Sequence, residues 1–203
     1  MTNRFYPHSI YNFLRIAESN PSIKRILDCG AGGPDPKLAI FNEYGYEMHG
    51  IDIDDDQIKD AQAFTQKHNI KLNIIKGDMR EIPFEDEYFG FAYSYLSMVH
   101  ITKGDIGIAI DEIHRVLQKG GLCYINFLSK DDNWYEESND NFLGEIKTEH
   151  DGVQEIHSYF DDNEPDKYFH KFKILYNAKI KIFIGKYHNT GRTCILDYIT
   201  QKL

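Results

Sequence analysis

The sequence has few positive charges, few cysteines and no long apolar segment. Among its 203 residues, 23 are Lys or Arg and 32 are Asp or Glu, which gives a formal net charge of −9. A protein that binds a phosphate backbone needs clustered basic residues, so this balance argues against nucleic acid as the partner. No stretch reaches the roughly 18 to 20 apolar residues of a membrane span, and residues 1–13 lack the pattern of a secretory signal.

Cysteine and histidine are too dispersed to predict a metal site or a disulfide framework. Cys29, Cys123 and Cys194 lie far apart and form no C-x-x-C pair, which favours buried thiols in a reducing compartment. The nine histidines form no H-E-x-x-H motif, so we expect no metal. The predicted location is the cytoplasm.

Short apolar runs alternate with helical patterns over the first two-thirds of the chain. This alternation predicts βα units, and therefore an α/β fold whose parallel sheet is covered by helices on both faces. An N-terminal amphipathic helix is expected to end near Asn20. The apolar runs predict strands at residues 26–28, 48–53, 72–75, 89–95 and 122–128.

The remaining elements follow from capping signals and from a change in composition. Asp35 and Asp54 are placed to cap two helices, and a third helix carries an apolar stripe from Ile106 to Leu117. After Ser129 the apolar period is lost. The sequence predicts a long connection at 129–156, a short helix at 161–169, and two long strands at 172–184 and 193–199 that pair through a turn at 185–192.

The most informative stretch is ILDCGAGGPDP, residues 26–36. A strand that runs into closely spaced glycines lets a ligand approach the bare backbone, where N–H groups are available to it. The dinucleotide pattern G-x-G-x-x-G fails here, because its last position is Asp35. The glycines are therefore compatible with a ligand site and also with a tight turn that binds nothing.

Three aspartates are placed at the ends of consecutive predicted strands. Asp28, Asp52 and Asp78 should converge, because the carboxyl ends of neighbouring parallel strands lie at one edge of the sheet. An acidic residue at the position of Asp52 can bind both hydroxyls of a ribose. The alternative is that Asp52 belongs to a solvated acidic turn with residues 54–56. Without a nearby basic residue, the three acids suit a nucleoside that carries a positive group better than a pyrophosphate.

Four segments in the right order resemble one family. ILDCGAG, HGIDIDDDQIKDAQ, GDMREIPFEDEYFGFAYS and EIHRVLQKGGLCYINF together resemble the class I S-adenosylmethionine-dependent methyltransferases, in particular the small-molecule, type 11 branch. The resemblance covers residues 24–128. It implies a Rossmann-like, seven-stranded, mostly parallel sheet with an antiparallel last strand. The length of the chain and the lack of internal repeats predict one domain. Within it we expect an N-terminal helix at 1–22, a cofactor-binding core at 24–128 and a substrate side at 129–203.

The resemblance implies a role for individual residues. Asp52 would bind the ribose hydroxyls, Asp78 would meet the adenine amino group, and Asp28 would stand near the ammonium group. Pro34 occupies the position of the family's third glycine, which leaves the path of this loop open, and Gly90 replaces a common Asp, which we expect to be a packing difference. The implied cofactor-binding residues are Asp28, Gly30, Ala31, Gly32, Asp52, Ile53, Asp78, Met79 and Ser94.

The acceptor side is less defined. His100 is a candidate to accept a proton, although such a histidine is also common as a structural hydrogen-bonding residue. No N-P-P-Y motif follows the fourth strand, which disfavours methylation of DNA bases and of glutamine. The candidate pocket residues are Tyr6, Tyr11, Tyr95, His100 and Trp134, and the aromatic ones among them are equally compatible with core or lid packing.

Three functions are compatible with these features. The first is transfer of a methyl group from S-adenosylmethionine to an unidentified small molecule, by a monomer or homodimer without nucleic-acid or membrane partners. The second is a non-catalytic module that binds S-adenosylmethionine. The third is an NAD-dependent oxidoreductase, which the incomplete glycine pattern disfavours.

Overall fold

The computed structural model describes residues 7–136, 144–150, 153–183 and 192–203. Within these ranges nine strands form one hydrogen-bonded sheet. Two of them form a hairpin that joins the sheet at one end of β5, and the other seven follow the order β3-β2-β1-β4-β5-β9-β8. These seven are β1 (Arg25–Cys29), β2 (Glu47–Asp52), β3 (Ile74–Lys76), β4 (Phe89–Ser94), β5 (Leu117–Ser129), β8 (Phe172–Phe183) and β9 (Arg192–Lys202).

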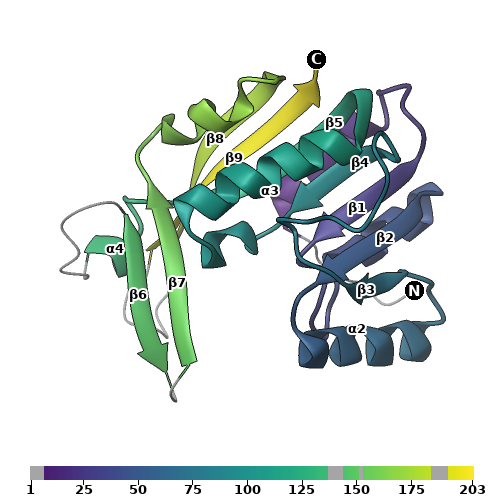
Figure 1. Ribbon diagram of the computed structural model, residues 1–203, viewed down its shortest axis with the longest axis horizontal. Coiled ribbons are helices and arrows are strands. Elements are labelled where there is room, and N and C mark those ends of the chain that lie inside the picture. Colours follow the sequence, from purple (N-terminus) through teal and green to yellow (C-terminus); the bar gives the residue numbers. More distant parts are fainter. Residues whose placement is uncertain (1–6, 137–143, 151–152, 184–191) are drawn as a thin grey trace.

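The direction of the strands confirms the expected fold class. Strands β3, β2, β1, β4 and β5 pair in parallel. The last strand, β9, is antiparallel to both β5 and β8, so β8 again runs in the direction of the parallel strands. The result is a mostly parallel, seven-stranded body with an antiparallel last strand (Figure 1).

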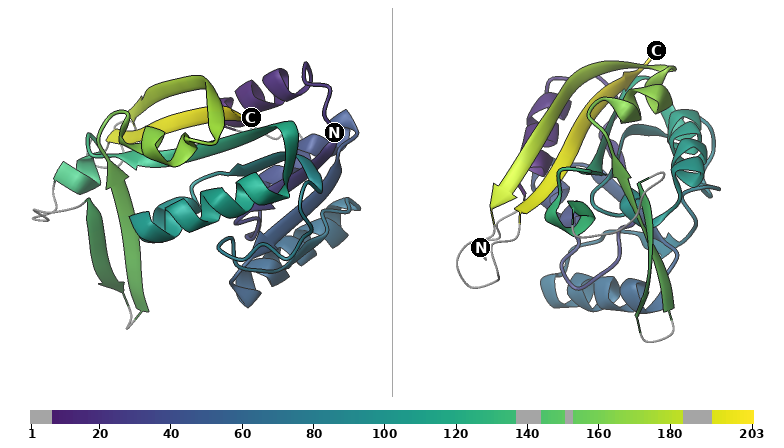
Figure 2. Two further views of the ribbon diagram at one scale, coloured as in Figure 1. Left: turned by 45° about the horizontal axis from the view of Figure 1, so that its top comes forward. Right: turned by 90° about the vertical axis from the view of Figure 1, so that its left-hand side faces the viewer.

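Helices cover both faces of this sheet, as Figure 2 shows. Helix α1 lies on one face and α3 on the other, and each packs on its own cluster of buried apolar side chains. No helix in the described part of the chain is long and apolar enough to cross a membrane. The helices are α1 (His8–Ala17), η1 (Lys37–Tyr44), α2 (Asp55–His68), η2 (Met98–His100), α3 (Lys103–Val116), α4 (Asn133–Glu136) and η3 (Glu164–Phe169).

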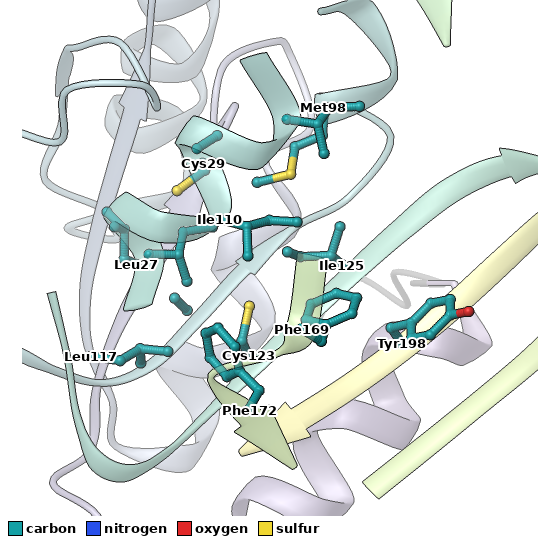
Figure 3. Close-up of a cluster of buried hydrophobic side chains, with 14 of the residues drawn as sticks. Leu27, Cys29, Met98, Ile110, Leu117, Cys123, Ile125, Phe169, Phe172 and Tyr198 are labelled. Atoms are coloured by element: carbon teal, nitrogen blue, oxygen red, sulfur yellow. The ribbon is translucent and has the colours of Figure 1, made fainter. Parts of the chain in front are cut away.

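The core follows from the alternation of side chains along buried strands. On β5, Cys123 and Ile125 face α3, whereas Tyr124 between them belongs to the cluster under α1. Figure 3 shows the α3 side, where Leu27 and Ile110 lie in the same cluster as these two β5 residues. All three cysteines are buried and free, in agreement with their expected role as small core residues.

Residues 129–156 are not the irregular connection that the sequence predicts. They include α4, β6 (Glu145–His150) and the start of β7 (Val153–Phe160), and β6 and β7 form an antiparallel hairpin. Among the described residues, the hairpin joins the sheet only where Leu128 and Ser129 of β5 pair with β7. The hairpin projects from the body (Figure 1), and residues 147–149 and 155 are exposed. Residues 158–160 are buried where β7 meets β5, so the buried stretch is too short to show an apolar period.

The first predicted helix cap is wrong and the second is confirmed. Asp35 does not cap the next helix; its side chain pairs with Lys37 at 2.7 Å, and the helix η1 is of the 3-10 type. Asp54 caps α2, because its carboxylate accepts hydrogen bonds from the backbone N–H groups of Asp56 and Gln57 at 2.7 and 3.1 Å. The turn predicted at 185–192 lies outside the described residues apart from its last position.

Candidate active site

The carboxyl ends of the parallel strands open into a cavity of about 490 Å³. Asp28 near the end of β1, Asp52 at the end of β2 and Asp78 after β3 all line this cavity. The convergence that the sequence predicts for these three aspartates is therefore present. The predicted residues that line the cavity also include Gly30, Ala31, Gly32, Ile53, Met79, Tyr95 and His100.

Glycine is required at two positions of the cavity wall. Gly30 has φ +94°, and a Cβ there would overlap the Ser97 side chain. At Gly32, a Cβ would lie 2.6 Å from Oδ2 of Asp52 and 2.5 Å from Cβ of Gln57. The turn therefore presents bare backbone to the cavity, which lets a ligand approach it closely.

The Asp52 carboxylate is held by two backbone N–H groups. Oδ2 accepts a hydrogen bond from Gly32 N at 2.8 Å, and Oδ1 accepts one from Asp54 N at 3.0 Å. Each carboxylate oxygen can accept a second hydrogen bond, so both oxygens can still accept hydrogen bonds from the two hydroxyls of a diol in the cavity. The alternative expectation was a solvated acidic turn that only caps a helix. Asp54 has this role, because it caps α2, whereas Asp52 lines the cavity.

Asp28 is buried, with 3% of its surface exposed. The hydroxyl of Tyr93 donates a hydrogen bond to Oδ2 of Asp28 at 2.6 Å. Burial raises the pKa of Asp28 to about 7; the Tyr93 hydrogen bond opposes this rise, and the charge of Asp52 adds to it. A cation in the cavity would favour the ionised form of Asp28.

Asp78 has a basic neighbour that the sequence argument overlooked. Nε and Nη2 of Arg80 lie 3.0 and 2.7 Å from the two carboxylate oxygens of Asp78. This fork keeps the pKa of Asp78 below its usual value. Among the described residues, Asp78 and Asp35 have ion-pair partners, whereas Asp28 and Asp52 have none. The preference for a positive ligand therefore rests on these last two residues.

Several predicted residues lie away from the cavity. Ser94 is fully buried in β4, and its hydroxyl has no hydrogen-bond partner among the described residues. Tyr11 is 41% exposed, because it lies on the face of α1 that points away from the sheet. Trp134 is 75% exposed on α4 and does not line the cavity. Tyr6 lies outside the described residues.

The loop after β4, which the sequence marks as a candidate segment of the acceptor side, adds two residues to the cavity wall. Leu96 and Ser97 line the cavity, and Leu96 has a positive φ of 54°. Its backbone N–H donates to Oδ1 of Asn126 at 2.8 Å, which holds the loop to β5. No sequence motif marks this contact, because the two residues are 30 positions apart.

His100 lines the cavity from η2 and contacts a second histidine. The ring of His157, on β7, packs edge-on against it with 4.9 Å between centroids. Burial lowers the pKa of His100, the proximity of His157 lowers it further, and Glu155 opposes both. The pKa of His100 therefore lies below the ordinary histidine value, although its side chain is exposed.

Gly90 packs against the backbone before β1. A Cβ at this position would overlap the carbonyl oxygen of Ile23, so an Asp would not fit without movement of that segment. Its departure from the family pattern is a packing difference, as expected.

Comparison with known proteins shows a similarity to methyltransferases. The type 11 methyltransferase model, described as "Methyltransferase domain", matches residues 27–125. A sterol 24-C-methyltransferase of Pneumocystis carinii is 36% identical over 101 residues, which cover 48% of this chain and 26% of that protein. This chain therefore matches only about a quarter of the length of that relative.

Solved structures share the fold over nearly the whole chain. A SAM-dependent methyltransferase of Methanosarcina mazei has a TM-score of 0.75 at 21% identity and covers 98% of both chains. The 1,6-didemethyltoxoflavin-N1-methyltransferase of Burkholderia thailandensis, solved with 1,6-didemethyltoxoflavin and S-adenosylhomocysteine, has a TM-score of 0.66 at 15% identity; the match covers 96% of this chain and 78% of that one. Residues 27–125 therefore match a methyltransferase domain, and nearly the whole chain has the fold of a solved SAM-dependent methyltransferase.

Proposed function

We propose that this protein transfers a methyl group from S-adenosylmethionine to a small-molecule acceptor in the cavity beside the glycine turn. The observation that carries the proposal is the meeting of Asp28, Asp52 and Asp78 with bare glycine backbone around one cavity of about 490 Å³. A small-molecule acceptor is supported by the sterol in the name of the Pneumocystis relative and by the 1,6-didemethyltoxoflavin bound in the Burkholderia enzyme.

Each polar residue of the cavity binds a different part of S-adenosylmethionine. Asp52 accepts hydrogen bonds from the ribose hydroxyls with the carboxylate orientation that Gly32 N fixes. Asp28 faces the ammonium group, and Asp78 accepts from the adenine amino group beside Met79 and Ile53. The turn from Gly30 to Gly32 admits the methionine chain, with Ala31 between the two glycines.

When bound, S-adenosylmethionine supplies a methyl group on a positively charged sulfur. The chain's own residues therefore need chiefly to hold the acceptor in line with this methyl group and to exclude water from the two reactants. The loop at residues 95–97 forms the wall of the cavity after β4. Asn126 fixes this wall through the backbone of Leu96. A wall held in this way keeps the acceptor in line with the methyl group without a large rearrangement.

The proposal extends to the whole chain. Residues 1–203 would act as one domain, in which 24–128 hold the cofactor while 1–22 and 129–203 shape the acceptor side. The three buried free cysteines support a reducing, cytoplasmic location. We propose a monomer or homodimer whose partner is a small molecule and not a nucleic acid.

Calorimetric titration with S-adenosylhomocysteine tests the proposal without knowledge of the acceptor. The wild-type protein should bind, and Asp52→Asn should bind more weakly by about 2 kcal/mol, because its amide group no longer accepts two charge-assisted hydrogen bonds. Asp55→Asn is the matched control, because Asp55 lies outside the cavity in an exposed pair with Lys76. Absence of binding to the wild-type protein would refute the proposed function.

A further inference from the structure

The methionine part of S-adenosylmethionine carries a carboxylate as well as an ammonium group, and the aspartates of the cavity cannot pair with that carboxylate. Like charges repel each other, and a carboxylate that leaves water needs a cation or a hydrogen-bond donor. Among the described residues that line the cavity, the Lys and Arg side chains are Lys37 and Arg80. These two are the candidate partners of the carboxylate.

Arg80 is held at the end of the cavity that lies next to β3. Its Nε and Nη2 hold the carboxylate of Asp78, and its Nη1 lies 3.4 Å from Oδ1 of Asp105 in the first turn of α3. Asp78 follows β3, and β2 lies between β3 and β1. The ends of β3 and β1 are therefore roughly 10 Å apart, which is two inter-strand spacings. Arg80 thus belongs to the Asp78 end of the cavity, away from Asp28.

Lys37 begins η1, beside the glycine turn. The next residue, Leu38, packs over the same point of β2 as Ala31 of the glycine turn. A Cβ added at Gly50 would lie 3.5 Å from Cδ2 of Leu38 and 2.5 Å from Cβ of Ala31. The start of η1 and the glycine turn are therefore neighbours over β2.

The same helix also covers Asp28. The Phe41 ring of η1 lies 5.6 Å from the Tyr93 ring, measured between centroids. The Tyr93 hydroxyl in turn donates to Asp28 at 2.6 Å. Lys37 and Asp28 thus bring one positive and one negative group to the part of the cavity under η1. The ammonium and carboxylate groups of methionine are attached to one carbon atom, so a pair of opposite charges on this side matches them.

The Lys37 ammonium group has donors left for a ligand. Its Nζ donates to Oδ2 of Asp35 at 2.7 Å, and 30% of its side chain is exposed. A lysine ammonium group has three N–H donors, so two remain after the bond to Asp35. Asp35 therefore holds the ammonium group at the cavity without using all of its donors.

We propose that Lys37 binds the carboxylate of the methionine part of S-adenosylmethionine through its ammonium group. This inference rests on the proposed function and adds a residue to the same binding site. Lys37 and Asp28 together recognise the amino acid as a zwitterion, so the site discriminates between a ligand that has the carboxylate and one that lacks it.

Calorimetry with two ligands tests this inference. The first is S-adenosylhomocysteine, and the second is its decarboxylated analogue, 5′-(3-aminopropylthio)-5′-deoxyadenosine, which keeps the adenosine, the sulfur and the amino group. The wild-type protein should bind S-adenosylhomocysteine about tenfold more tightly, as expected for one charge-assisted hydrogen bond. Lys37→Gln should lose this preference, because it binds S-adenosylhomocysteine more weakly and the analogue no more weakly than the wild type does. Lys37→Arg keeps the charge and should keep most of the preference.

Lys59→Gln is the matched control. Lys59 forms a similar pair with Asp56 at 2.6 Å on α2, outside the cavity, so this variant should keep the tenfold preference. The ratio of the two affinities separates a lost carboxylate contact from a damaged fold, because damage to the fold weakens both ligands.

Three results would overturn the inference. The first is a wild-type protein that binds the two ligands equally tightly. The second is a Lys37→Gln variant that keeps the wild-type preference. The third is an equal loss of affinity for both ligands in Lys37→Gln, which would give Lys37 a role in the fold and not in binding the carboxylate. Failure of the wild-type protein to bind either ligand would refute the proposed function instead.

Discussion

Asp28→Asn should change the pH dependence of stability in a way that follows from the burial of Asp28. The pKa rises from the ordinary 3.8 to about 7 in the folded chain, so the folded state binds a proton more tightly than the unfolded state does. The protonated Asp28 carboxyl therefore contributes its full stabilisation of the folded state below about pH 4, and this contribution is lost as the pH rises to 7. At about 1.4 kcal/mol per tenfold change in proton affinity, the loss is about 4 kcal/mol.

An asparagine at position 28 cannot ionise and keeps nearly the same shape, so the variant lacks this loss. The free energy of unfolding of Asp28→Asn minus that of the wild type should increase by about 4 kcal/mol between pH 4 and pH 8. Asp197, which is also buried with a raised pKa, is present in both proteins and cancels in the difference.

Urea unfolding at several pH values measures this difference. Circular dichroism is the suitable signal, because the one tryptophan, Trp134, is already 75% exposed in the folded chain. Tyr93→Phe removes the hydrogen bond that lowers the pKa of Asp28, so it should move the stability loss to higher pH. A difference between Asp28→Asn and wild type that stays constant from pH 4 to pH 8 would refute the reasoning.

Two further predictions concern ligand binding. Gly32→Ala should abolish binding of S-adenosylhomocysteine in a calorimetric titration, because the new Cβ would lie 2.6 Å from Oδ2 of Asp52; Gly104→Ala, whose nearest contact is at 3.7 Å, is the control that should bind normally. Arg80→Gln should let the pKa of Asp78 rise toward its ordinary value, so affinity should fall more at pH 5 than at pH 7.5. Equal losses at both pH values would contradict the role given to Arg80.

The parallel sheet was predictable because each buried strand is a short apolar run, bounded by residues that end strands or cap helices. The cap at Asp54 is a local signal, since its partners lie two and three residues away. Asp35 gives a similar signal, but it lies between Pro34 and Pro36 and pairs with Lys37 instead. Local patterns alone do not distinguish these two cases.

The convergence of the three aspartates was predictable because it follows from strand direction alone. The acceptor side was not, because it depends on contacts between distant residues. His100 and His157 are separated by 57 positions, as are Ile101 and Ser158, which hydrogen-bond to each other. Among the residues of β7 whose burial is described, only Ser158 to Phe160 are buried, so no apolar period along the hairpin marks it. Arg80 lies two residues after Asp78, and its positive charge at this spacing is a local signal that predicts the Asp78–Arg80 ion pair.

The most direct measurement is a crystal structure of the protein with S-adenosylhomocysteine. We predict that the ribose hydroxyls lie within hydrogen-bond distance of Asp52, the amino group of the homocysteine faces Asp28, and the adenine lies beside Asp78. A ligand bound elsewhere on the chain, or one whose ribose and amino group contact neither Asp52 nor Asp28, would contradict the account.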